Sequence, residues 1–315
     1  MSAVPLGLRA KRRRSALRTL GFLSPWLIGL CVFFLYPLVS TVYFSFMKYD
    51  GFTAPTWVGL KNWSYVFQDN PFFWPALRNT LWLVLVMVSL RVLFGLGIGL
   101  LITKIKTGAG VFRTLFYLPY LAPPVAATMA FVFLLNPGTG PTNTILEKAG
   151  LSPPQWFNDA AWSKPSLTIL ALWGIGDLMV IFMASLLDVP KEQYEAAELD
   201  GAGAWQRFRF VTLPSISPIV LFAVVTGVIA TMQYYTEPLV AAKVASGVIG
   251  GSGQQFEPGY PEKSTLTVPQ VVYNLGFQRF DTGAACVVAL VLFALAMVFT
   301  AFLMRRRSGF MSAED

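Results

Sequence analysis

The chain has 315 residues, of which 55% are apolar and 13% charged, and its mean hydropathy is +0.58. Soluble domains carry about 25% charged residues, so this composition indicates an integral membrane protein and excludes a disordered chain. The net charge of +8 fits basic cytoplasmic segments of a membrane protein, and no nucleic-acid partner is expected. Histidine is absent, which argues against ordinary hydrolases and metal sites. Cys31 and Cys286 lie in apolar runs and are expected to pack as small apolar side chains.

Apolar runs of membrane-spanning length occur six times along the chain. A hydrocarbon core of about 30 Å requires about 20 apolar residues in a helix. We therefore expect an all-α membrane protein with a basic tail at 1–19, a six-span domain at 20–305 and a second tail at 306–315. The runs cover about residues 20–46, 80–103, 114–135, 167–187, 216–235 and 283–304.

Lys and Arg are distributed unevenly between alternate segments of this pattern. The two tails and the second-to-third and fourth-to-fifth connections hold 15 of them, whereas the three longer remaining connections hold 8. Positively charged segments stay in the cytoplasm, so both termini are expected there. The first apolar run exceeds the roughly 7 to 15 residues of a signal-peptide core and has no cleavage pattern after it, so we expect it to remain in the mature protein.

Gly95 and Gly99 form a pair of small residues four positions apart in the second run. Such a pair lets two helix backbones approach closely. The pair favours helix packing within the chain over a dimer interface, because most glycines in such runs relieve crowding between neighbouring helices.

The connection between the fourth and fifth runs is charged and aromatic. Pro190 is suited to open a short helix, and Gly201 and Gly203 are suited to end it, because glycine reaches the left-handed conformation at little cost. A second short helix is expected over Trp205 to Thr212, ending at Leu213-Pro214. Two helices joined by a glycine turn at the cytoplasmic surface predict a knob that docks on a soluble partner.

The same connection carries a family pattern. Glu195-Ala196-Ala197, Gly201, Val211 and Leu213-Pro214 resemble the E-A-A...G...I-x-L-P coupling loop of bacterial ABC importer membrane subunits, with valine where the family usually has isoleucine. The stretches 112–119, 135–137 and 205–208 look like the carbohydrate branch of that family, the maltose-type and glycerol-3-phosphate-type permeases. The resemblance covers roughly residues 20–305.

This resemblance implies a type I ABC importer permease fold in a bacterial inner membrane and import of a sugar or oligosaccharide by alternating access. The implied partners are a second, different permease subunit, two ATPase subunits that bind ATP and Mg²⁺, and an extracytoplasmic solute-binding protein. No catalytic residue, metal or cofactor is implied for this chain. Within a coupling loop at 189–214, the residues implied to contact the ATPases are Glu195, Ala196, Ala197, Glu198, Asp200, Gly201, Leu213 and Pro214.

Several polar side chains near the middle or ends of the runs are candidates for the solute path. A charge at mid-membrane costs a few kcal/mol, so Asp177 and Arg91 either contact solute or pair structurally. The aromatic and polar side chains that end the fifth run suit sugars, although an interfacial aromatic belt explains them equally well. The expected path residues are Asp177, Gln233, Tyr234, Tyr235, Glu237 and Asn274. A polyol, a glycerol phosphate ester, or an ion-coupled secondary transporter remains as an alternative.

Overall fold

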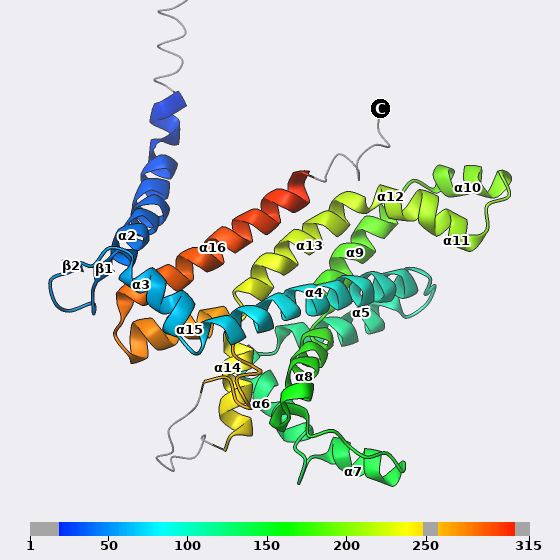
Figure 1. Ribbon diagram of the computed structural model, residues 1–315. Helices are drawn as coiled ribbons and strands as arrows, with labels where there is room; N and C mark the ends of the chain where they lie inside the picture. Colours follow the sequence, from blue (N-terminus) through cyan, green and yellow to red (C-terminus); the bar gives the residue numbers. More distant parts are fainter. Residues whose placement is uncertain (1–18, 248–257, 306–315) are drawn as a thin grey trace, which may run out of the picture.

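A computed structural model describes residues 19–247 and 258–305 (Figure 1). The tails expected at 1–19 and 306–315 lie outside these residues, apart from Thr19. Three helices are each long and apolar enough to cross a membrane: Thr19–Ser45, α4 (Phe73–Thr103) and α16 (Thr282–Arg305). They coincide with the first, second and sixth predicted runs, although α4 begins several residues before the predicted start.

The third and fourth predicted runs are bent helix pairs, and the fifth begins at a bend. The stretch Ala109–Leu121, which contains α5 (Ala109–Tyr117) and η3 (Leu118–Leu121), meets α6 (Pro124–Leu134) at 99°. Ala122 and Pro123 are extended there, because a proline disfavours helical backbone in the residue before it. The sequence predicts one continuous span at this point, and the structure shows a sharp bend.

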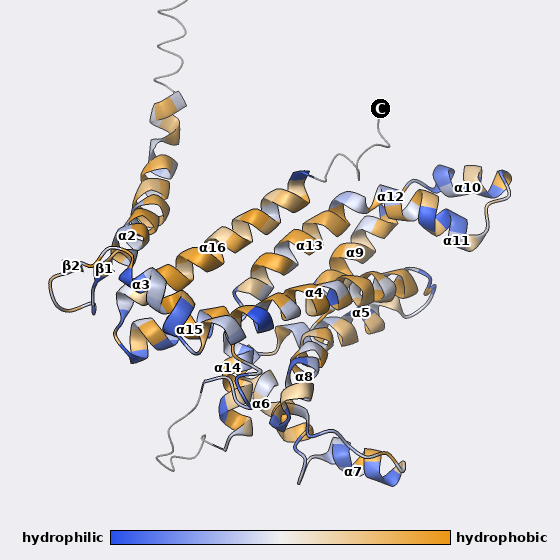
Figure 2. Ribbon diagram, viewed as in Figure 1, coloured by the Kyte–Doolittle hydropathy of each residue, from blue (hydrophilic) through white to orange (hydrophobic). Residues whose placement is uncertain are grey.

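The second and third bends are less sharp. α8 (Ala160–Trp173) meets α9 (Gly176–Leu187) at 51°, and the stretch Ala204–Ser215 meets α13 (Ser217–Met232) at 66°. Counting each bent pair as one span gives up to six spans by length and composition. In Figure 2 apolar residues run along α4, α9, α13 and α16.

The long helix α4 packs along α9 and α13 and also contacts α8. A Cβ added to Gly95 would lie 3.0 Å from the Cβ of Leu178, and one added to Gly99 would lie 3.3 Å from the backbone nitrogen of Met183. Both contacts are with α9. The glycine pair therefore packs within the chain, as its spacing predicts, and places α4 against the first two turns of α9.

The N-terminal helix packs only partly on the rest of the described chain. Its last part, α2 (Tyr36–Ser45), contacts α16, whereas the segment before it projects away in Figure 1. This projecting segment includes the π-helical turn η1 (Cys31–Leu35). The most apolar 18-residue stretch of the helix has no buried residue. Cys31 is exposed on this apolar helix, and Cys286 is half-buried in α16.

Short elements complete the two ends of the bundle. The strands β1 (Met47–Lys48) and β2 (Thr56–Trp57) are antiparallel, with Met47 paired to Trp57. The α13 helix ends near α14 and α15 at one end, and begins near α10 and α11 at the other (Figure 1). The short elements at the end of the bundle where α13 ends are α3 (Lys61–Ser64), η2 (Tyr65–Asp69), α7 (Pro141–Lys148), η4 (Trp156–Asn158), α14 (Thr236–Ala245), α15 (Val268–Tyr273) and η6 (Asn274–Gln278).

Candidate functional site

The connection between α9 and α13 forms an elbow, which we define as residues 189–215. Its first helix, α10 (Lys191–Leu199), follows Pro190 directly. The rest of the elbow is α11 (Ala204–Arg207), η5 (Phe208–Thr212) and α12 (Leu213–Ser215). The second helical stretch thus runs to Ser215, slightly beyond its predicted end. Pro214 occupies one of the first two positions of α12, where a missing N–H removes no helical hydrogen bond.

The turn between the two helices depends on Gly201, whose φ is +77°. The backbone N–H of Ala202 donates to the carbonyl of Ala197 at 2.9 Å, and that of Gly201 donates to the carbonyl of Glu198 at 3.0 Å. This pair of bonds is the Schellman arrangement that closes a helix with a left-handed residue. A Cβ at Gly201 would meet no atom within 4 Å, so the requirement for glycine is conformational and not steric.

Side-chain contacts join the two helices of the elbow into one body. Glu198 and Arg207 form an ion pair at 3.0 Å, and the hydroxyls of Tyr194 and Thr212 are hydrogen-bonded at 2.9 Å. Tyr194, with Phe208 and Val211, also packs against the core cluster that contains the fully buried Ile216. The elbow is therefore anchored to the core that α9 and α13 share.

The opposite face of the elbow is open. Leu199 is 90% exposed, and Trp205 and Phe210 are 68% and 69% exposed. Large apolar side chains next to carboxylates at such a tip are typical of a docking surface. Of the residues predicted for coupling, Ala197 and Pro214 are half-buried, and the exposed ones are Glu195, Ala196, Glu198, Asp200, Gly201 and Leu213.

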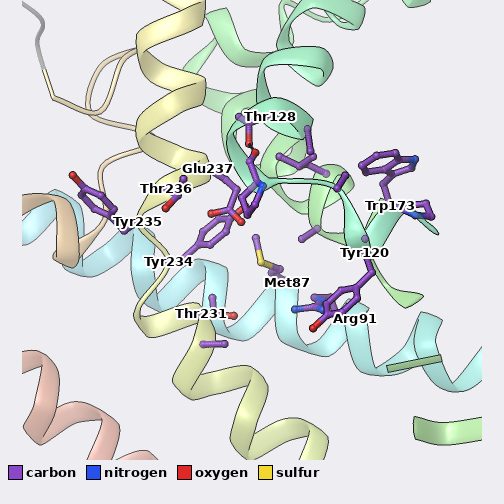
Figure 3. Close-up of a pocket in the computed structure, with 18 of the residues that line it drawn as sticks. Met87, Arg91, Tyr120, Thr128, Trp173, Thr231, Tyr234, Tyr235, Thr236 and Glu237 are labelled. Atoms are coloured by element: carbon purple, nitrogen blue, oxygen red, sulfur yellow. Dashed lines mark hydrogen bonds between the residues drawn. The ribbon is translucent and has the colours of Figure 1, made fainter. Parts of the chain in front are cut away.

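A second candidate site is a cavity of about 460 Å³ (Figure 3). It lies where the bend between α8 and α9, the bend before α6 and the junction of α13 with α14 meet the middle of α4. Figure 3 shows Tyr234 and Glu237 on one side of it, with Arg91 and Tyr120 on another. Aromatic rings and hydrogen-bonding groups are therefore brought together from segments that are distant in sequence.

Four of the predicted path residues line this cavity: Gln233, Tyr234, Tyr235 and Glu237. Asn274 is not among its lining residues. It is buried in η6, where its amide donates to the side-chain carbonyl of Gln278 at 2.6 Å. The cavity also contains residues that the sequence analysis did not single out, namely Met87, Tyr120, Thr128, Trp173, Thr231 and Thr236. Tyr120 and Trp173 each lie at a helix break, which is the signal that would have found them.

Asp177 is paired with Arg91. Nη2 of Arg91 lies 3.0 Å and 3.2 Å from the two carboxylate oxygens of Asp177, across the contact of α4 with α9. Arg91 lines the large cavity, whereas Asp177 lines a smaller adjoining pocket of about 120 Å³ that Arg91 also borders. Of the two explanations that the sequence leaves open for these charges, the structure shows the pairing.

A mostly buried return segment at 258–267 is hydrogen-bonded to α4 and to the chain just before α14. The side-chain amide of Asn79 donates to the carbonyls of Lys263 and Leu266 at 2.7 Å and 3.0 Å. The hydroxyl of Thr267 donates to the carbonyl of Tyr234 at 2.8 Å. This segment thereby ties α4 to the start of α14. The described residues contain no cluster of three or more Cys, Asp or Glu side chains suited to a metal ion.

The long apolar helices, the exposed elbow and the cavity at the helix breaks together define a helical membrane protein of the transporter class. The family model for binding-protein-dependent transport system inner membrane components matches residues 91–308. The probable ABC transporter permease protein YesP of Bacillus subtilis is 30% identical over 304 residues, which cover 96% of this chain and 94% of the relative. The chain belongs to this family of ABC transporter permeases.

Other relatives and a solved structure agree with this assignment. The arabinooligosaccharides transport system permease protein AraP of Halalkalibacterium halodurans is 32% identical over 88% of this chain and 83% of its own length. The lactose transport system permease protein LacF of Rhizobium radiobacter is 29% identical over 89% and 91%. A chain of a bacterial ABC transporter involved in import of the acidic polysaccharide alginate has the same fold, with a TM-score of 0.73, 22% identity, and coverage of 95% of this chain and 98% of that one.

Proposed function

We propose that the chain is one of two different transmembrane subunits of an ATP-driven importer, and that it moves a sugar or oligosaccharide into the cytoplasm by alternating access. Relatives named for arabinooligosaccharide and lactose transport support the solute class. The aromatic and hydrogen-bonding lining of the cavity supports it independently, because sugar CH faces stack on rings while hydroxyls bind polar tips.

The observation that carries this proposal is the construction of the elbow. Its exposed face, with Glu195, Leu199 and Gly201, would seat in a cleft of an ATPase subunit. Its inner face, with Tyr194 and Phe208, is packed on the core. A movement of the ATPase is then transmitted to α9 and α13 through packed contacts. The junctions at the far end of α13 and at the start of α9 border the cavity, so their displacement changes access to it.

The remaining parts of the machine follow from this assignment. Two ATPase subunits would hold ATP and Mg²⁺, and an extracytoplasmic solute-binding protein would deliver the solute. The chain would cross the bacterial inner membrane six times, with α13 as the fifth span, the elbow before it in the cytoplasm, and both termini in the cytoplasm. The basic residues of the elbow, Lys191, Arg207 and Arg209, lie on the cytoplasmic side in this topology.

The test begins with the ATPase partners. Gentle purification of the tagged chain from its native host is expected to recover an ATP-hydrolysing subunit, and repeated recovery without one would contradict the proposal. In the complex, Gly201→Asp and Glu195→Lys are expected to abolish solute-dependent ATP hydrolysis and uptake while the amount of folded protein stays normal. Normal uptake in either variant would count decisively against the coupling role.

Two matched controls separate coupling from local strain. Gly108, between α4 and α5, has φ of +80° and, like Gly201, no atom within 4 Å of an added Cβ. Gly108→Asp therefore carries the same backbone strain, about 1 kcal/mol, outside the elbow tip. Glu192→Lys makes the same charge change as Glu195→Lys on an exposed residue of the same helix. Both controls are expected to retain uptake.

A further inference from the structure

The charge on the cavity wall is the feature that distinguishes between classes of solute. Tyrosines apart, the ionisable side chains among the described residues that line the cavity are Arg91 and Glu237. They lie on different sides of it (Figure 3). An arginine in a solute cavity by itself predicts an anionic solute, such as a uronic acid or a phosphate ester, because a guanidinium binds those groups with paired hydrogen bonds.

The charge of Arg91 is balanced by a carboxylate. Its Nη2 is committed to both carboxylate oxygens of Asp177, and its Nε is buried without a hydrogen-bond partner. The side chains of Arg91 and Asp177 are only 21% and 28% exposed, so water screens their attraction poorly. Because the two opposite charges are about 3 Å apart, their combined field at the far side of the cavity is much weaker than that of a lone cation.

The other groups on the wall offer no replacement for that cation. Glu237 is acceptor-only when ionised and donates a single hydrogen bond when protonated, so it supplies a positive charge in neither form. Gln233 and Thr231 provide neutral donors and acceptors. An anionic solute would therefore lose its hydration without gaining an unbalanced positive charge, whereas neutral hydroxyls find both donors and acceptors.

We propose that Asp177 sets the charge selectivity of the cavity by masking Arg91, so that the cavity takes neutral or amino saccharides and disfavours anionic ones. Asp177 acts through Arg91 and does not itself touch the solute. This inference rests on the proposed function for its solute class, but the charge of the cavity is testable without knowledge of the solute.

The test measures the electrostatic potential of the cavity with thiol reagents of opposite charge. Ala230 borders both the cavity and the smaller pocket, and it is exposed, so Ala230→Cys places a reporter beside the ion pair. The background carries Cys31→Ala and Cys286→Ala. The purified complex is treated with the cationic reagent trimethylammonioethyl methanethiosulfonate or the anionic reagent sulfonatoethyl methanethiosulfonate, and the rate at which each modifies the reporter cysteine is measured. The ratio of the cationic to the anionic rate is then divided by the same ratio measured with 2-mercaptoethanol, which corrects for the intrinsic reactivity of the two reagents.

The normalised ratio of cationic to anionic rates is expected to exceed one. Asp177→Asn unmasks Arg91 and is expected to lower the ratio about three- to tenfold, the effect of one unit of charge acting on reagents of opposite sign at this range. The double variant Arg91→Leu with Asp177→Leu removes the pair without changing the net charge and should stay within about twofold of the parent. A purely structural role for Asp177 would not change the ratio of the rates of two reagents of similar size.

Two results would overturn the proposal: a parent ratio below one, or an unchanged ratio in Asp177→Asn. A second reporter, Thr236→Cys, guards against an inaccessible position. Failure of both reporters to react with either reagent would show that the cavity is not open to small solutes, and this too would overturn the proposal.

The solute class is then tested with the assembled transporter in proteoliposomes. The probes are lactose, the glucosamine disaccharide and digalacturonate, which are neutral, cationic and anionic. ATP-dependent uptake of lactose or the glucosamine disaccharide, but not digalacturonate, is expected, and uptake of digalacturonate alone would overturn the inferred class. If none of the three is taken up while the rate ratio behaves as expected, the failure lies with the proposed function and not with the charge of the cavity.

Discussion

Gly176 is the first residue of α9, and its Cα faces the backbone of α5. A Cβ at this position would lie 2.6 Å from the carbonyl oxygen of Phe116 and 2.6 Å from the Cα of Tyr117. Backbone atoms do not move aside as the end of a flexible side chain does. To restore an ordinary contact of 3.4 Å, α5 and α9 must separate by about 0.8 Å, which disturbs close packing on both sides.

The expected cost of Gly176→Ala is that of overpacking, about 1 to 3 kcal/mol. In a domain of this size each kcal/mol corresponds to about 2 to 4 °C in Tm, so a fall of about 2 to 12 °C is expected. The adjacent residue, Asp177, is paired with Arg91, so displacement of α9 is also expected to weaken that ion pair. The assay is thermal unfolding of the purified complex in detergent, followed by tryptophan fluorescence.

Gly97→Ala is the matched control. Gly97 lies in α4, and a Cβ there would meet no atom within 4 Å. Replacing a glycine inside a helix with alanine favours the helix by about 0.5 to 1 kcal/mol, so its Tm should be unchanged or slightly higher. A Tm for Gly176→Ala that is no lower than that of Gly97→Ala would refute the reasoning and would mean that the α5–α9 contact yields without cost.

Two further predictions concern hydrogen bonds that hold the elbow and the 258–267 segment. Tyr194→Phe removes the hydrogen bond to Thr212 at a cost of about 0.5 to 1.5 kcal/mol. We expect solute-stimulated ATP hydrolysis to fall relative to basal hydrolysis. An unchanged ratio of the two rates would show that this bond does not stiffen the elbow. Asn79→Ala leaves the carbonyls of Lys263 and Leu266 without their donor, at a cost of about 1 to 3 kcal/mol. Limited proteolysis should then cleave the 258–267 segment faster. Equal cleavage rates in variant and parent would contradict the role of Asn79 as an anchor for this segment.

Local features of the sequence predicted the elbow well. Pro190 opens α10, and the left-handed Gly201 ends it, because proline and glycine restrict or permit backbone angles whatever surrounds them. The same reasoning left a smaller error at the far end, where the second helix continues to Ser215. There, packing of Ile216 into the core fixes where the chain bends into α13, and that packing is not a local property.

The cavity was predicted only in part. Gln233, Tyr234, Tyr235 and Glu237 are consecutive or nearly so, and their mixture of rings and polar tips was visible as a cluster. Their partners on the other walls lie about 60 to 150 residues away in the chain, at helix breaks whose angles the sequence did not give. Asn274 had a similar composition signal, but folding placed it in η6, away from the cavity.

The sequence by itself determined the number and position of the apolar runs and the breakpoints of the elbow, because hydrophobic length and backbone preference are properties of neighbouring residues. Only the tertiary structure decided that Arg91 faces Asp177 and that the third run bends by 99°. Those outcomes depend on which helices pack against each other. The free energies of burial, charge pairing and close contact that select the neighbouring helices are summed over the whole chain, so a local stretch of sequence does not reveal them.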